Sequence, residues 1–95
     1  MLILAVDTSS KQFSVALLRN SDVVAETAGV SEEPYASRIF ADAGRVLAQA
    51  GVELGQIELF AVATGPGSFT GLRVGLTAVK GWSEVFGRPV APVSV

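Results

Sequence analysis

GPGSFTGLRVG, residues 65–75, contains four glycines and a proline in eleven residues. The stretch lies between an apolar run, residues 57–63, and a helix-like run that follows it. Glycine and proline at this density specify the path of the backbone, so the sequence predicts a tight junction between a strand and a helix. Such a junction either holds an anion at a helix N-terminus or lets another backbone come close.

Outward from this junction, the chain divides into short strand-like and helix-like runs. Turn residues and apolar periodicity predict strands and helices in the order βββαβαβ. We expect strands at 2–6, 13–18, 23–27, 57–63 and 90–95, with helices over about 33–50 and 70–86 that stop at Gly51 and Gly87. This order is typical of an α/β, ribonuclease-H-like half-domain with a mixed five-stranded sheet. We expect one domain, residues 1–95, that is the first half of a longer protein.

The composition excludes several classes of function. Hydrophobic residues make up 49% of the 95 residues and charged residues only 17%, which favours a well-buried sheet or a surface that another protein covers. The sequence has no histidine and no cysteine, so the usual zinc ligands and the commonest general base are missing. The net charge is −2 without a basic cluster, which argues against direct binding of nucleic acid. No signal peptide or membrane-spanning run is predicted, and we expect a cytoplasmic protein.

The first helix has, besides its core stripe and its polar stripe, a third stripe that holds no large or charged side chain. At 100° per residue, its core stripe is Tyr35, Ile39, Ala43, Val46 and Ala50, and its solvated stripe is Arg38, Asp42, Arg45 and Gln49. A third stripe holds only small residues: Ser37, Ala41, Gly44 and Ala48. Alanine is a good helix former, but glycine inside a helix costs about 1 kcal/mol relative to alanine. The stripe therefore predicts a surface that lets another helix approach closely.

The second helix has an apolar arc too wide for one sheet to cover. Its polar residues form one narrow stripe, and the rest of its circumference is apolar or small. We assign part of this surplus to a partner interface: Gly71, Val74, Gly75, Ala78 and Trp82. Either a further part of the chain or a partner chain is expected to cover these residues.

Two short motifs are candidates for phosphate or magnesium binding. Asp7, Thr8 and Ser9 follow the first strand, where a carboxylate organises magnesium and hydroxyls meet phosphate, although an ordinary turn has the same composition. Ser68 or Thr70 can cap the second helix and help its amides to hold an anion. The stretch has no Gly-Lys-Ser/Thr ending, and Phe69 suits packing better than phosphate binding. A nucleophilic role for Ser68 lacks a histidine to activate it.

The run LILAVDTS at 2–9, together with GPGSFTGLRVGL at 65–76, resembles the TsaB family, also called YeaZ, across all 95 residues. The resemblance implies an actin-like or sugar-kinase-like fold and a non-catalytic subunit of the machinery that makes threonylcarbamoyladenosine at position 37 of tRNA. It also implies a catalytic TsaD-like paralogue and a TsaE-like ATPase as partners, with tRNA met only through the complex. Homodimers are implied for the chain alone, through the two helices. Family members are about twice as long, so their C-terminal half-domain is expected to be absent here.

One position departs from the family pattern, and two other functions stay open. Many relatives have a His-Ser-Glu-like stretch where this chain has Tyr35-Ala36-Ser37, so any function of that histidine is lost. The first alternative is half of a nucleotide-dependent phosphotransferase that uses ATP and magnesium, with Asp7 organising the metal. The second is a glycoprotease-type metallopeptidase, for which the chain offers no catalytic residues. We expect no catalytic residue, no resident metal and no required cofactor.

Overall fold

The computed structural model describes residues 1–8, 12–30, 35–63 and 69–93. The elements confirm the predicted order βββαβαβ and add a short 3-10 helix, η1, which the sequence analysis did not predict. In chain order they are β1 (Leu2–Asp7), β2 (Gln12–Arg19), β3 (Asp22–Val30), α1 (Tyr35–Ala50), η1 (Leu54–Gln56), β4 (Leu59–Ala63), α2 (Phe69–Phe86) and β5 (Val90–Val93). The start predicted for the first helix near residue 33 and the end predicted for the last strand lie outside the described residues.

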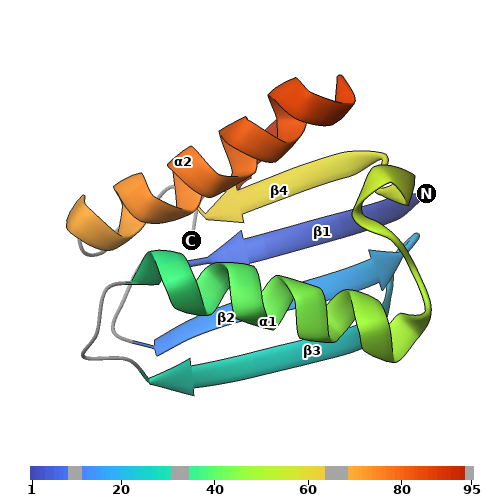
Figure 1. The fold of residues 1–95 in the computed structure, drawn as a ribbon, viewed down its shortest axis with the longest axis horizontal. Helices are drawn as coiled ribbons and strands as arrows, with labels where there is room; N and C mark the ends of the chain where they lie inside the picture. The colour runs from blue at the N-terminus through green and yellow to red at the C-terminus, as the bar shows by residue number, and fades with distance from the viewer. Residues whose placement is uncertain (9–11, 31–34, 64–68, 94–95) are drawn as a thin grey trace.

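The five strands form one mixed sheet, as predicted, and their spatial order is β3-β2-β1-β4-β5. Figure 1 shows β3, β2, β1 and β4 side by side. β1 pairs antiparallel with β2 and parallel with β4, and β4 pairs parallel with β5. Because β1 and β4 run in the same direction, Asp7 and Ala63 end these strands at the same edge of the sheet. That edge is where ligands bind in many α/β proteins.

Both helices pack against the same face of this sheet, with α1 over β2 and β3 and α2 over β4 (Figure 1). Alternate residues of the strands point toward the helices, as the period of a strand requires. Together they form one hydrophobic core, whose largest fully buried members include Leu4, Leu17, Ile39, Phe60, Val62 and Val79. The core stripe predicted for the first helix is confirmed at Ile39, Ala43 and Val46.

The opposite face of the sheet carries a row of alanines. The strand register places Ala16, Ala5, Ala61 and Ala91 side by side on β2, β1, β4 and β5. All four side chains are half-buried. On β1 and β4 they alternate with buried residues of the core, so the row lies on the face that α1 and α2 do not cover. The small side chains leave this face hollow near its centre.

Glycine ends both helices, as predicted. Gly51 has φ +67° and Gly87 has φ +63°, the left-handed conformation that glycine adopts without strain. After α1, the amide of Val52 donates to the carbonyl of Leu47 at 3.0 Å. This bond satisfies a carbonyl that the last helical turn leaves free, which is how such glycine-terminated helices close.

The prediction that Asp42 lies on a solvated stripe of α1 is wrong. Asp42 is only 2% exposed. It lies three residues after Ile39 and four before Val46, so it shares the edge of their core-facing side. Arg45, whose side chain is mostly exposed, reaches back to the Asp42 carboxylate at 3.9 Å.

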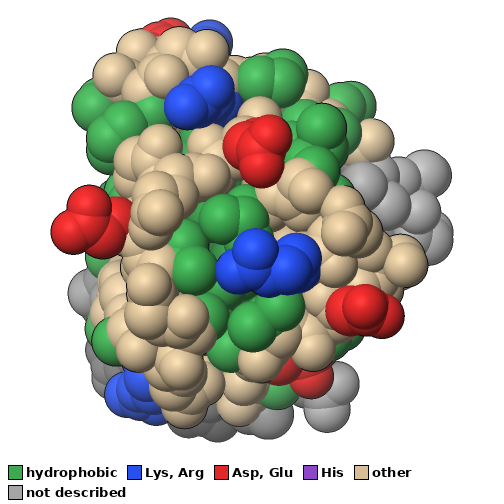
Figure 2. All heavy atoms as spheres, turned by 90° about the vertical axis from the view of Figure 1, so that its right-hand side faces the viewer, with side chains coloured by type: hydrophobic (Ala, Val, Ile, Leu, Met, Phe, Trp, Pro, Cys, Tyr) green, Lys and Arg blue, Asp and Glu red, His purple; other side chains and the backbone are tan. Residues whose placement is uncertain are grey.

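Large hydrophobic side chains are exposed at the end of the molecule where α1 and α2 finish. Figure 2 looks onto this end and shows hydrophobic side chains at the surface between isolated charged groups. Val85, near the end of α2, is 75% exposed, and Phe86 is partly covered by its contact with Gly55 of η1. No helix in the described part of the chain is long and apolar enough to cross a membrane.

Candidate functional site

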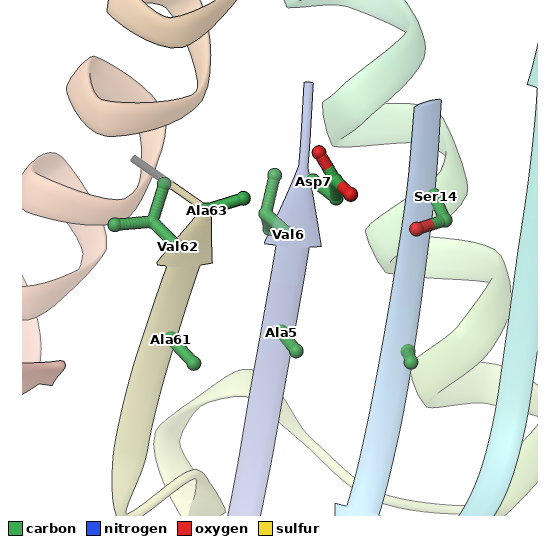
Figure 3. Close-up of a pocket in the computed structure, with 8 residues that line it drawn as sticks. Ala5, Val6, Asp7, Ser14, Ala61, Val62 and Ala63 are labelled. Atoms are coloured by element: carbon green, nitrogen blue, oxygen red, sulfur yellow. The ribbon is translucent and has the colours of Figure 1, made fainter. Parts of the chain in front are cut away.

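A shallow hollow of about 180 Å³ lies on the open face of the sheet, at the carboxyl end of β1 (Figure 3). The alanines of β1, β2 and β4 form its floor because their side chains are short. Asp7 lies at its rim, directly opposite Ser14 of β2 in the antiparallel register. The residues that line the hollow are Ala5, Val6, Asp7, Ser14, Ala16, Ala61, Val62 and Ala63.

The polar groups of the hollow are few for a catalytic site. One carboxylate and one hydroxyl line it, and all of its other lining residues are apolar. Within the described ranges, no group of three acidic, histidine or cysteine side chains is placed to hold a metal ion. Ser9 and Ser68, two of the predicted phosphate candidates, lie outside the described residues. The predicted phosphate or magnesium site therefore stays a prediction, with Asp7 at the position that it requires.

Thr8 has a different environment from the one predicted. The side chain is 0% exposed, so its hydroxyl does not reach the solvent where a phosphate would bind. Its neighbour is Gly75 of α2, so close that a Cβ atom added to this glycine would overlap the Thr8 Oγ1 atom. Thr8 thus belongs to the contact between β1 and α2, and the prediction of Thr8 as a phosphate ligand is corrected.

Three residues predicted at a partner interface are buried inside this chain. Gly75, Ala78 and Trp82 lie on the side of α2 that faces the sheet. With Val79 they recur at three- and four-residue spacing, which places them on one side of a helix. The sheet covers this side, so no partner is needed to bury it. Gly75, Ala78 and Trp82 are therefore corrected to core positions.

The predicted small-residue stripe on α1 does face outward. Ala41, Gly44 and Ala48 are all exposed, and a Cβ atom added to Gly44 would meet nothing within 4 Å. Their contact with a partner stays a prediction. Ser37, Gly71 and Val74, the other predicted interface residues, fall outside the described side chains.

Sequence reasoning missed an exposed aromatic side chain that bridges the two helices. Phe40 of α1 is 53% exposed and meets the ring of Trp82 edge-on, with ring centroids 5.6 Å apart. Trp82 also packs against Phe60 of β4, with ring centroids 5.9 Å apart. A signal was present in the sequence, because Phe40 is a large apolar residue outside the core stripe of its helix.

The exposed apolar and small residues of α1 and α2 form a surface that we call the helix face. Its members are Phe40, Ala41, Gly44 and Ala48 of α1, with Gly81 and Val85 of α2. Leu76 is also exposed, but it lies nine residues before Val85 and thus about half a turn around α2. Gly81, like Gly44, has open space where a Cβ atom would be. The helix face therefore combines large apolar groups with places where a second backbone can come close.

Comparison with known proteins identifies relatives of the chain. The family model described as TsaD, tRNA N6-adenosine threonylcarbamoyltransferase, matches residues 11–95. The chain is 35% identical to the Haemophilus influenzae tRNA threonylcarbamoyladenosine biosynthesis protein TsaB, over 99% of the chain and 39% of that protein. It thus spans about two fifths of the length of this curated relative.

Solved structures give the same result for the fold. YeaZ from Pseudomonas aeruginosa superposes with a TM-score of 0.90 at 35% identity, covering 98% of this chain and 43% of that one. A ROK hexokinase from Thermus thermophilus shares the fold at 18% identity, with a TM-score of 0.64 over 99% of this chain and 34% of the hexokinase. These likenesses confirm the predicted ribonuclease-H-like, sugar-kinase-like half-domain. The chain belongs to the TsaD family and, as its predicted resemblance indicated, to the TsaB/YeaZ proteins within it.

Proposed function

We propose that this chain acts in the synthesis of threonylcarbamoyladenosine on tRNA as a non-catalytic, activating subunit. Its relatives named TsaB support the pathway, and the helix face supports the role. In this proposal the helix face binds a TsaD-like paralogue, and a TsaE-like ATPase joins the complex. The chain contacts tRNA only as part of that complex. The complex acts in the cytoplasm.

The observation that carries the proposal is the pairing of exposed aromatic and glycine residues on the helix face. Phe40 is 53% exposed, and burying the rest of this aromatic side chain against a partner lowers the free energy of the complex. Gly44 and Gly81 each weaken their helix, by about 1 kcal/mol relative to alanine, and nothing inside this chain fills the space beside them. Both features are explained if helices of another subunit pack here. The same face can bind a second copy of the chain when no paralogue is present.

The chemistry of the chain supports a non-catalytic role. The sequence has no histidine and no cysteine, and the hollow beside Asp7 offers one carboxylate and one hydroxyl. A hydroxyl acts as a nucleophile when an adjacent base activates it, and histidine, the commonest such base, is missing from this sequence. Catalysis is therefore assigned to the paralogue.

Binding to the paralogue is tested by mixing the chain with the TsaD-like protein of its own organism and measuring mass by light scattering after gel filtration. We expect a 1:1 complex. Ala41→Arg, which places a long charged side chain on the helix face, should abolish it. Ala28→Arg, the same change at an exposed position of β3, is the matched control and should bind as the unaltered chain does. A complex that survives Ala41→Arg would mean that the helix face is not the interface, and no complex at all would refute the proposal.

The hollow favours one alternative, half of a nucleotide-dependent phosphotransferase. Asp7 is at the carboxyl end of a central strand, where a magnesium-organising carboxylate would be placed. Calorimetry with magnesium and ATP tests it on the chain and on its complex. Binding at micromolar concentration that Asp7→Ala abolishes would favour the phosphotransferase over the non-catalytic subunit. A metallopeptidase gains no support from the described side chains, and elemental analysis of the purified chain is expected to find no stoichiometric metal.

A further inference from the structure

We infer that Thr8 and Gly75 are a pair of positioning residues that set the height of α2 above the sheet and thereby the shape of the helix face. The inference rests on the proposed function, because it assigns these residues a role in partner binding. Thr8 is buried and is therefore not placed to bind phosphate; the inference assigns it a structural role instead.

The contact between the two residues is close. Thr8 immediately follows β1 and is completely buried. A Cβ atom at position 75 would lie 3.5 Å from the Thr8 Cβ and 3.6 Å from its Cγ2, and would overlap its Oγ1. Threonine is branched at Cβ, and a buried side chain has little room to rotate away. Position 75 therefore has to be glycine for α2 to lie at its present distance from β1.

Two other helical glycines whose surroundings the structure describes, Gly44 and Gly81, lack this closeness. Added Cβ atoms at Gly44 and Gly81 meet nothing within 4 Å. Helix propensity alone would favour alanine at all three positions. Only at Gly75 does the surrounding structure oppose it.

Gly75 and Trp82 are coupled through the geometry of α2. They are seven residues apart, about two turns, so they share the side that faces the sheet. Lifting α2 at Gly75 therefore moves Trp82 away from Phe60 beneath it and changes its contact with Phe40 of the helix face. A rigid helix transmits the change from the end of β1 to the docking surface.

The test is a set of four variants: Gly75→Ala, Thr8→Ala, the double variant Thr8→Ala/Gly75→Ala, and Gly81→Ala as the matched control for the fluorescence measurement alone. Affinities are compared among the first three variants and the unaltered chain, because Gly81 itself belongs to the helix face. Two measurements are made. Trp82 is the only tryptophan, so its fluorescence emission reports the position of α2. The affinity for the TsaD-like paralogue reports the shape of the helix face.

We expect Gly75→Ala to shift the Trp82 emission to the red and to weaken the complex about tenfold, which is about 1.4 kcal/mol. Gly81→Ala should not shift the Trp82 emission to the red, and it should not destabilise the fold. The double variant should restore both signals to the values of Thr8→Ala, because the overlapping Oγ1 atom is gone. If Gly75→Ala does not fold, recovery of folding in the double variant supports the pair just as well.

Three results would overturn the inference. The first is a Gly75→Ala variant that matches Gly81→Ala in emission. The second is an emission shift without any loss of affinity, and the third is a double variant that recovers neither signal. The proposed function is tested separately by the binding of the unaltered chain. If the unaltered chain does not bind the TsaD-like paralogue, the proposed function is wrong, whatever the Trp82 emission of the variants shows.

Discussion

Phe40 and Phe60 both contact the indole ring of Trp82, so replacing each by alanine compares a surface aromatic with a core aromatic. Phe60 is 0% exposed, while Phe40 is 53% exposed. Both rings lie within 6 Å of Trp82 by their centroids, at 5.6 Å for Phe40 and 5.9 Å for Phe60. The same atoms are removed in both cases, and the largest difference between the two sites is the burial of the ring.

The two substitutions are expected to differ about twofold in their cost. Phe60→Ala removes a fully buried ring and leaves a cavity, which costs about 3–5 kcal/mol. Phe40→Ala loses roughly half of the burial of a phenyl side chain and an edge-on ring contact worth about 0.5–1.5 kcal/mol, which gives about 2 kcal/mol in all. A domain of this size has a free energy of unfolding of about 5–14 kcal/mol, so Phe40→Ala should fold and Phe60→Ala should be marginal.

Urea denaturation followed by Trp82 fluorescence measures both free energies, with circular dichroism as a second probe that does not depend on the altered ring contact. At the same time, Phe40→Ala should weaken binding to the paralogue, because Phe40 is the largest side chain of the helix face. The reasoning is refuted if the two variants lose the same free energy of unfolding. It is also refuted if Phe40→Ala keeps the full affinity of the unaltered chain.

Three further predictions concern the helices. Gly44→Ala should stabilise the isolated chain by about 0.5–1 kcal/mol in the same denaturation assay, because an added Cβ meets no atom and the unfolded chain loses freedom; a destabilised variant would contradict the open space at this position. Gly51→Ala should instead destabilise it by about 1–2 kcal/mol, since its φ of +67° is strained for any residue with a Cβ, and equal stability would show that the helix ends differently. Arg45→Ala should change the free energy of unfolding by less than about 1 kcal/mol, because its ion pair with Asp42 is long and the arginine is exposed; a larger loss would mean that the buried Asp42 carboxylate depends on Arg45.

The open face of the sheet has features that could be predicted from the sequence and one that could not. The strand positions and their alternation were predictable, because period-two patterns and turn residues are local. The alanine row was not, since it exists only when residues 5, 16, 61 and 91 come into register. The position of Asp7 at the carboxyl end of a central strand was predictable, because ligands of open α/β sheets bind at the carboxyl ends of the strands.

Local patterns were enough to predict the order of the elements, the glycines that end both helices and three core positions of the first helix. Each of these depends on residues within a few positions of one another, through backbone sterics or the period of a helix. Of the stretch from 65 to 75, the structure describes the surroundings of Gly75, which takes part in a close contact within this chain. Only the tertiary structure showed that Gly75 meets Thr8, 67 positions earlier in the chain, and that Ala78 and Trp82 belong to the core of this chain. A helix with a wide apolar arc has several sides that can be buried, and packing against the sheet decides which of them remains for a partner.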